Sequence, residues 1–142
     1  MNKTQTLIGV SAVAIDGRAL LIEGGPGSGK STLALALIDR GARLIGDDGV
    51  RWEYSSGTIL LSSPPNIAGK IEIRGVGIVE LDVTSAPLSL ILTFASETPR
   101  LPEAVDTRDW DGVSVPCLPL RKNDLMQALR AEWALRIHGL TF

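Results

Sequence analysis

The chain has 142 residues, with 14 basic and 16 acidic side chains and a formal net charge of -2. This length predicts a single domain over residues 1–142, and the 44% apolar and 21% charged composition excludes wholesale disorder. The slightly acidic balance argues against a nucleic-acid-binding domain, which is usually basic. The single cysteine, Cys117, and the single histidine, His138, exclude an internal disulfide framework and any site that needs two imidazoles.

Targeting and membrane signals are not visible in the sequence. Residues 1–10 contain no sustained apolar core of a signal peptide. The most apolar stretch, residues 88–94, is far shorter than the roughly 20 residues of a membrane-spanning helix. We therefore expect a cytoplasmic protein without a membrane span.

The chain begins with a predicted β-hairpin. Apolar runs at residues 10–15 and 18–23 flank Asp16-Gly17, which is a strong turn signal. Within the second run, residues 19–22 are continuously apolar, which is typical of a strand buried on both faces.

A helix and a short strand follow this hairpin. Residues 32–40 are strong helix formers, and Gly41 is placed to end the helix. Residues 43–45 read as a strand that leads to Asp47 and Asp48. The order strand, loop, helix, strand predicts the beginning of an α/β unit.

The middle of the chain is β-rich. A second hairpin is predicted over residues 50–61, and its turn is Ser55-Ser56-Gly57. Residues 62–66 contain two consecutive prolines and read as a loop. Residues 69–81 alternate polar and apolar side chains around two glycines, and residues 88–94 read as a further strand.

The last third contains a predicted loop, strand and helix. Residues 97–111 are rich in charge and proline and are expected to form a surface loop, and a short strand is expected over residues 113–118. Asn123 is a good N-cap for a closing helix that stops near Gly139, with His138 at its end. An apolar stripe on this helix is expected to pack in the core, with an oligomer contact as the alternative. The stripe comprises Leu125, Leu129, Trp133 and Ile137.

A phosphate-binding loop is the most specific motif. The pattern G-x-x-x-x-G-K-S lies between a buried-type strand and a helix, where glycines let backbone N–H groups converge on an anion. The lysine supplies a positive charge for the β/γ-phosphates, and the serine hydroxyl can bind Mg²⁺. The predicted nucleotide-binding residues are Gly24, Gly25, Pro26, Gly27, Ser28, Gly29, Lys30, Ser31 and Thr32.

Acidic residues after the phosphate loop are less decisive. Asp47 and Asp48 could face a metal ion near the phosphates, or could simply form a polar turn between Gly46 and Gly49. Neighbouring residues of an extended strand point to opposite faces, so at most one of them is expected to face the phosphates. Glu72 and Arg74 share a strand face and could act at the site or form an exposed ion pair.

The segment 24–50, together with residues 71–79, resembles the catalytic domain of HPr kinase/phosphorylase. The first segment carries the phosphate loop, the helix and the run Arg40-Gly41-Ala42-Arg43-Leu44-Ile45-Gly46-Asp47-Asp48, and the second is similar to the other signature of that family. The pattern is most similar to the short proteobacterial form that lacks the N-terminal domain. The resemblance implies an α/β P-loop kinase domain with a mixed, β-rich sheet, few helices and a C-terminal helix.

The resemblance also implies roles for individual residues. Lys30 and the loop would hold ATP, while Ser31, Glu72 and Asp47 are the predicted Mg²⁺ ligands. Asp48 matches the catalytic acid/base of the family, which would phosphorylate a serine of the phosphocarrier protein HPr and phosphorolyse the phosphoserine. Arg74, with Arg100 or Arg121, is a further candidate for orienting phosphates. A homo-oligomer, a hexamer in the family, is also implied.

Two alternatives remain open at this stage. The family carries a histidine just ahead of the first hairpin, whereas this chain has Ile8-Gly9-Val10 there. This departure favours a nucleotide-binding regulatory module with impaired catalysis, while Lys30, Ser31, Asp48 and Glu72 favour the enzyme. A small-molecule kinase on the same scaffold is the third possibility, and the second signature argues against it.

Overall fold

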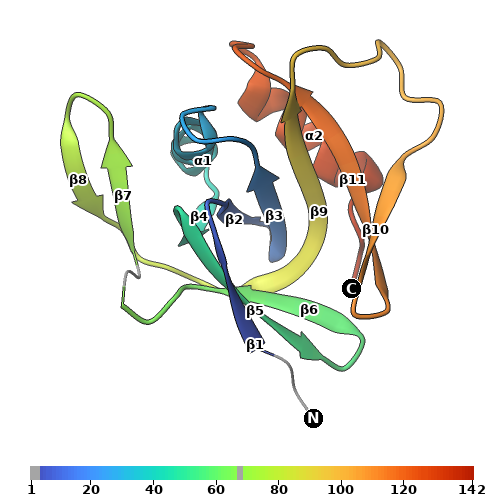
Figure 1. Cartoon of the computed structure of the whole chain (residues 1–142), viewed down its shortest axis with the longest axis horizontal. Helices are drawn as coiled ribbons and strands as arrows, with labels where there is room; N and C mark the ends of the chain where they lie inside the picture. Colours follow the sequence, from blue (N-terminus) through green and yellow to red (C-terminus); the bar gives the residue numbers. More distant parts are fainter. Residues whose placement is uncertain (1–3, 67–68) are drawn as a thin grey trace.

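The computed structural model describes residues 4–66 and 69–142 (Figure 1). The elements of this part of the chain are β1 (Thr4–Ile8), β2 (Ser11–Ile15), β3 (Arg18–Glu23), α1 (Lys30–Asp39), β4 (Arg43–Gly46), β5 (Gly49–Ser55), β6 (Thr58–Ser62), β7 (Lys70–Ile73), β8 (Gly77–Glu80), β9 (Ala86–Ala95), β10 (Asp106–Trp110), β11 (Val113–Arg121) and α2 (Gln127–His138). The predicted mixed, β-rich fold with few helices and a C-terminal helix is confirmed.

Strand β9 is the element around which the large sheet is organised. Nine of the described strands form this sheet, with the order β1-β5-β6-β9-β3-β2-β4 and with β11 and β10 branching from β9. Strand β9 pairs in parallel with β3 and β11, and its first residues pair antiparallel with β6. The carboxyl ends of three parallel strands therefore meet at one edge, where ligands of open α/β sheets usually bind.

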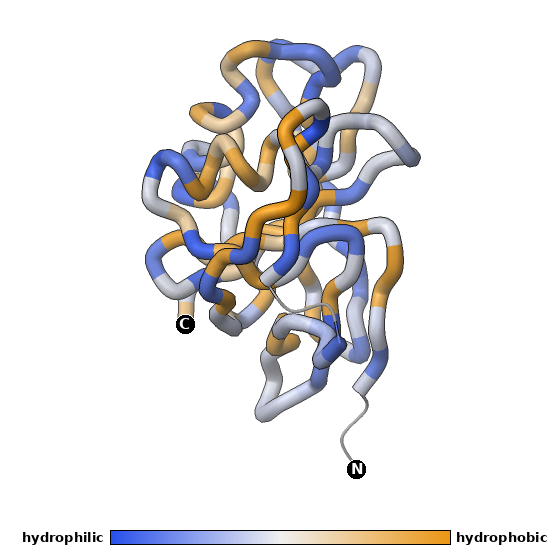
Figure 2. The backbone as a smooth tube through the Cα atoms, turned by 90° about the vertical axis from the view of Figure 1, so that its left-hand side faces the viewer, coloured by the Kyte–Doolittle hydropathy of each residue, from blue (hydrophilic) through white to orange (hydrophobic). Residues whose placement is uncertain are grey.

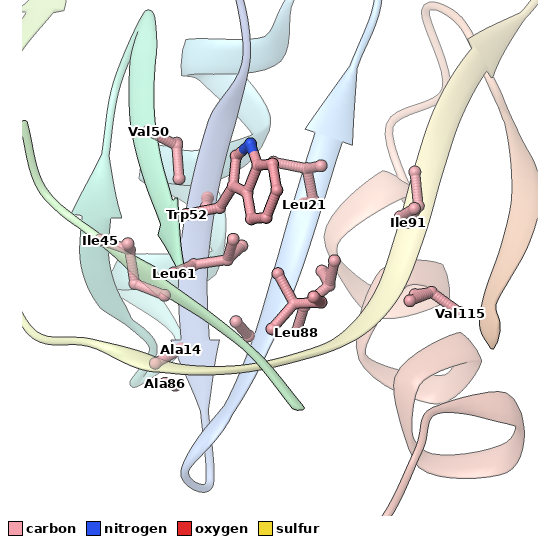
Figure 3. Close-up of a cluster of buried hydrophobic side chains, with 13 residues drawn as sticks. Ala14, Leu21, Ile45, Val50, Trp52, Leu61, Ala86, Leu88, Ile91 and Val115 are labelled. Atoms are coloured by element: carbon pink, nitrogen blue, oxygen red, sulfur yellow. The ribbon is translucent and has the colours of Figure 1, made fainter. Parts of the chain in front are cut away.

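Strand β3 is buried on both faces, as its continuous apolar run predicts. Its Ala19 and Leu21 contribute to a core cluster with Trp52, Ile59 and Leu61 from β5 and β6 (Figure 3). Its Leu20 and Ile22 pack on the opposite side in a second cluster that includes side chains of both helices. Burial of these large apolar side chains stabilises the sheet by about 1.5–3 kcal/mol each.

Turn chemistry explains the predicted hairpins. Asp16 and Gly17 both have positive φ, at 50° and 77°, and they join β2 to β3. Ser56 and Gly57 do the same between β5 and β6, with φ of 50° and 82°. Two successive left-handed residues match the twist of the paired strands, which is why such turns favour glycine. Both predicted hairpins are confirmed.

The segment expected to be a surface loop over residues 97–111 contains a strand, so that prediction is partly wrong. Strand β10 pairs with the first half of β11 around Asp111 and Gly112, whose φ values are 49° and 85°. The polar sequence of β10 did not indicate a strand. Its last residue, Trp110, packs edge-to-face on Trp52, with the ring centroids 5.6 Å apart. The Asp-Gly pair was the available signal.

Helix α2 differs from its prediction at its beginning. The helix starts at Gln127, and Asn123 lies before it in a left-handed turn with φ 57°, so Asn123 is not the N-cap. The N-cap is Met126, which has no side-chain cap hydrogen bond. Just before the helix, Asp124 Oδ1 accepts the backbone N–H of Met126 at 2.9 Å, and its Oδ2 accepts Arg130 Nε–H at 2.6 Å. These hydrogen bonds lower the pKa of Asp124. The predicted stop at Gly139 is confirmed.

The apolar stripe of α2 is not in the core, so the expectation of core packing was wrong. Leu125 is 100% exposed and Trp133 is 49% exposed. The buried residues of the helix are Ala131 and Leu135, with Ala128 and Ala134 packed against the same cluster. Trp133 instead lies under the guanidinium of Arg136, 4.3 Å from its ring centroid.

Strands β7 and β8 form a separate two-stranded sheet (Figure 1). Ile71 is its buried side chain and β7 contacts α1, whereas Val76 and Ile78 are 78% and 71% exposed. Figure 2 views the molecule from this side and shows hydrophobic residues along the hairpin. Across the described residues, neither helix is long and apolar enough to cross a membrane.

Candidate active site

The predicted phosphate loop joins the carboxyl end of β3 to the first residue of α1. Gly27 and Gly29 have φ of 70° and 103°, a backbone conformation that glycine adopts without steric cost. Gly29 is the N-cap of α1, and its carbonyl oxygen accepts the N–H of Leu33 at 3.0 Å. The helix therefore begins directly at Lys30, where unpaired N–H groups and the helix dipole favour an anion.

The ring of Phe94 on β9 lies close to Gly24 and Gly29 of the phosphate loop. A Cβ added to Gly24 would lie 3.1 Å from Phe94 Cδ2 and 2.6 Å from Ser28 Oγ, so no larger residue fits there without a shift. The Ser28 hydroxyl is buried and has no hydrogen-bond partner among the described residues. A buried, unsatisfied hydroxyl inside an anion-binding loop suits a ligand oxygen.

Lys30 lies across its own loop. Its Nζ donates to the carbonyl oxygens of Gly24 and Gly25, both at 2.8 Å. An ammonium group has three donors and no acceptor, so it can serve the loop carbonyls and a phosphate oxygen alike. The positive charge of Lys30 therefore lies beside the first residues of the loop, Gly24 and Gly25, and the motif predicts a lysine charge at the loop.

Asp47 is the carboxylate that lies next to the phosphate loop. Its Oδ1 accepts the hydroxyl of Ser31 at 2.7 Å and the hydroxyl of Ser11 at 2.8 Å. Hydroxyl and carboxylate oxygens are the ligands that Mg²⁺ prefers, and Mg²⁺ usually completes its shell with phosphates and waters. The Ser31–Asp47 pair therefore fits the predicted cation.

A tight turn separates Asp47 from Asp48. Asp48 is exposed and left-handed, with φ 57°, and its carbonyl oxygen accepts the N–H of Gly9 at 3.1 Å. A Cβ on Gly46 would lie 2.2 Å from the carbonyl oxygen of Gly49, so the turn requires glycine at this position. The segment is therefore a polar turn that also brings Asp47 to Ser31, and the metal role of Asp47 stays a prediction.

The remaining predicted site residues come from elements around the loop. Glu72 and Arg74 are exposed, with Glu72 on β7 opposite Ile78, and β7 contacts α1. Arg100 and Arg121 are exposed and follow β9 or end β11. In Figure 1 the loop above α1 has the β7–β8 hairpin to one side and the ends of β9 and β11 to the other. Within residues 4–66 and 69–142, the hydrogen bonds of Ser31 and Asp47 do not include any of these four residues.

An ion pair anchors the residue before the loop. Glu23 accepts two hydrogen bonds from Arg108, at 2.6 and 2.7 Å, and one from Thr93 at 3.2 Å. The hydrogen bond to Glu23 raises the pKa of Arg108. Burial raises the pKa of the nearby Cys117 thiol, which is half-buried.

Two contributors to the site were missed by sequence reasoning. Phe94 looked like an ordinary core residue of an apolar strand, and Ser11 looked like a strand residue without a role. No local sequence signal marks either residue. Their contact partners are far away in the sequence, and only the order of strands in the sheet brings them together. Among the described residues, no group of three or more His, Cys, Asp or Glu side chains is arranged to hold a metal ion by itself.

Comparison with known proteins places this chain in a family. A model of the HPr serine kinase C-terminal domain matches residues 1–85, which is more than half of the chain. The chain belongs to the HPr serine kinase C-terminal domain family. The match includes the phosphate loop, α1 and the Asp47-Asp48 turn, and so the predicted resemblance is confirmed.

Curated relatives and a solved structure agree with this family membership. A HPr kinase/phosphorylase of Clostridium botulinum is 48% identical over 69 residues, covering 49% of this chain and 23% of that protein. One from Limosilactobacillus reuteri is 36% identical over 118 residues, covering 73% of this chain and 37% of that protein. The chain thus spans only about a quarter to a third of these relatives.

The structural likeness covers nearly the whole chain. The Hpr(Ser) kinase/phosphatase of Coxiella burnetii superposes with a TM-score of 0.82 at 28% identity. The alignment covers 94% of this chain and 95% of that one. The family fold therefore extends beyond residue 85, where the match to the family model ends, to β9, β10, β11 and α2.

Proposed function

We propose that this chain is an ATP- and Mg²⁺-dependent protein serine kinase and phosphoserine phosphorylase that acts on the phosphocarrier protein HPr. The single observation that supports this most strongly is the hydrogen bond of 2.7 Å between Ser31 and Asp47, beside a phosphate loop with Lys30 at its mouth. Family membership supports the protein substrate, because the relatives named above are HPr kinases.

The chain's own residues would divide the work as follows. Backbone N–H groups of the loop and of the first turn of α1 would bind the β/γ-phosphates, and Lys30 would neutralise charge on them. Ser31 and Asp47 would hold Mg²⁺, with Glu72 as a further ligand. Bound Mg²⁺ supplies charge neutralisation of the phosphoryl oxygens. Arg74, with Arg100 or Arg121, would orient phosphates.

Asp48 would move the proton in both directions. As the serine oxygen of HPr forms its bond to the γ-phosphorus, Asp48 accepts the hydroxyl proton and ADP leaves. In phosphorolysis, inorganic phosphate attacks the phosphoserine phosphorus, the proton returns to the serine oxygen and pyrophosphate forms. The left-handed turn supports this role, because it separates Asp48 from Asp47 and leaves it exposed. Assembly into a homo-oligomer stays a prediction.

A regulatory module that binds nucleotide without turnover is the second candidate. The observation that favours it is the corner between β1 and β2, where Gly9 contacts the backbone of Asp48. The family has a histidine in this region, whereas this chain has Ile8-Gly9-Val10 and therefore no imidazole there. The two candidates predict the same nucleotide binding and opposite results for transfer.

Labelled ATP with Mg²⁺ and the cognate HPr tests the proposal. We expect serine phosphorylation by the parent protein and nucleotide binding by calorimetry. Lys30→Ala should weaken nucleotide binding about tenfold or more, since hydrogen bonds to charged groups contribute about 1.5–3 kcal/mol. Asp48→Asn should retain binding and lose about 10²–10⁴-fold in transfer rate.

Asp16→Asn is the matched control for Asp48→Asn. Asp16 is also an exposed, left-handed aspartate, with φ 50°, but it lies in the turn at the opposite end of β3. Its substitution should leave transfer unchanged. Nucleotide binding without any HPr phosphorylation would reject the enzyme in favour of the regulatory module. Absence of nucleotide binding by folded protein would reject both.

A further inference from the structure

A second hydroxyl reaches the carboxylate of Asp47 from the interior of the sheet. Ser11 is 1% exposed, and its Oγ donates to Asp47 Oδ1 at 2.8 Å. The same oxygen accepts Ser31 Oγ at 2.7 Å. One carboxylate oxygen thus lies between a donor on the phosphate-loop helix and a donor on β2.

Strand β2 is well placed to hold the acidic turn in register with the phosphate loop. It lies between β3, which leads to the loop, and β4, which leads to Asp47. Ser11 pairs with Ile22 of β3, and the next residue, Ala12, pairs with Gly46 of β4. The backbone that carries the Ser11 hydroxyl is therefore held by strand pairing with β3 on one side and with β4 on the other.

The neighbouring backbone adds a second attachment to the same turn. The N–H of Gly9 donates to the carbonyl oxygen of Asp48 at 3.1 Å. The corner between β1 and β2 thus contacts Asp47 through a side chain and Asp48 through the main chain.

We propose that Ser11 is a positioning residue that orients Asp47 for the divalent cation bound with the nucleotide. The proposal rests on the function proposed above. The Ser31 hydroxyl can direct its oxygen lone pairs to a cation while its O–H still donates a hydrogen bond to Asp47. Ser11 then restrains rotation of the Asp47 carboxylate, and such outer hydrogen bonds commonly change metal affinity 10–100-fold.

Ser89 provides the matched control. It is also fully buried, at 0% exposure, and its hydroxyl donates to the carbonyl oxygen of Leu140 at 2.6 Å. Ser89→Ala therefore also removes a buried serine hydrogen bond, but this bond goes to a backbone carbonyl and joins β9 to the segment after α2. A purely structural role for Ser11 predicts similar effects of the two substitutions.

Calorimetry with ATP in EDTA and with ATP in excess Mg²⁺ tests the proposal. The dissociation constant of ATP in EDTA, divided by the constant in excess Mg²⁺, measures how strongly cation and nucleotide binding are coupled. We expect Ser11→Ala to lower this ratio about tenfold while leaving the dissociation constant in EDTA unchanged. Ser11→Cys keeps the side-chain volume, replaces the hydroxyl with a weak donor and should give the same direction of change.

Each outcome decides the matter. An unchanged ratio in either folded Ser11 variant, with normal binding by the parent protein, overturns the positioning role and leaves the proposed function intact. Equal changes in Ser11→Ala and Ser89→Ala also overturn it, because they indicate general destabilisation. Failure of the folded parent protein to bind ATP removes the proposed function, and this inference with it.

Discussion

Asp47 and Asp48 are adjacent in the sequence and have different surroundings. Asp47 accepts hydroxyl groups from Ser31 and Ser11, whereas Asp48 is exposed at a left-handed backbone position. The difference arises from the turn between Gly46 and Gly49, which reverses the chain within four residues. One turn therefore gives the two aspartates different surroundings, as the separate roles proposed above for Asp47 and Asp48 require.

Gly46 makes this turn possible, and its substitution tests the geometry. Gly46→Ala would place a methyl group 2.2 Å from the Gly49 carbonyl oxygen, and backbone atoms cannot move away as a flexible side chain can. We expect the free energy of unfolding to fall by about 2–3 kcal/mol. Gly25→Ala, whose Cβ would meet nothing within 4 Å, is the control in the same denaturant titration. Equal stabilities would contradict this account of the turn.

At the scale of the element, helix α2 packs through its small side chains. Ala128, Ala131 and Leu135 follow the spacing i, i+3, i+7, which places them on one face. Small residues allow the helix to approach the sheet closely. The bulkier stripe that begins at Leu125 follows an equally regular spacing, and so periodicity alone could not distinguish the two faces.

A pair of identical substitutions in two leucines near and within α2 tests this assignment. Leu135→Ala should lower the free energy of unfolding by about 2–5 kcal/mol, because the side chain is 1% exposed and its loss leaves a cavity. Leu125→Ala should change it by less than about 0.5 kcal/mol, because that side chain is 100% exposed. Thermal or urea unfolding of both variants gives the comparison, and similar losses would place the stripe in the core after all.

At the scale of the whole molecule, the stabilising buried contacts are unevenly distributed among the elements. Strand β9 joins the two halves of the large sheet, and core clusters cover both of its faces. The β7–β8 hairpin, which carries Glu72 and Arg74, lies outside this sheet and buries chiefly Ile71. A two-stranded sheet is marginally stable by itself, so this hairpin depends on its contact with α1.

Native-state hydrogen exchange should reveal this unevenness. We expect the paired amides of β7 and β8 to exchange by local opening, at a lower free energy than the amides of β3 and β9. The central strands should exchange only when the whole domain unfolds, because both of their faces are buried. Equal protection of the hairpin and the central strands would show that the molecule opens as one unit.

The sequence by itself determined the features that depend on neighbouring residues. The phosphate loop, the Asp16-Gly17 and Ser56-Gly57 hairpins, and the end of α2 at Gly139 all follow from local backbone preferences. Strand β10 and the buried face of α2 were missed, because pairing with β11 and packing on the sheet decide them.

Only the tertiary structure decided how the site is assembled. Sequence reasoning left open which of the adjacent aspartates lies beside the loop, and the fold brings Asp47 to Ser31 across 16 positions. It also brings in Ser11, which is 36 positions away from Asp47. The order of strands in a sheet determines such distant contacts, and no local pattern records that order.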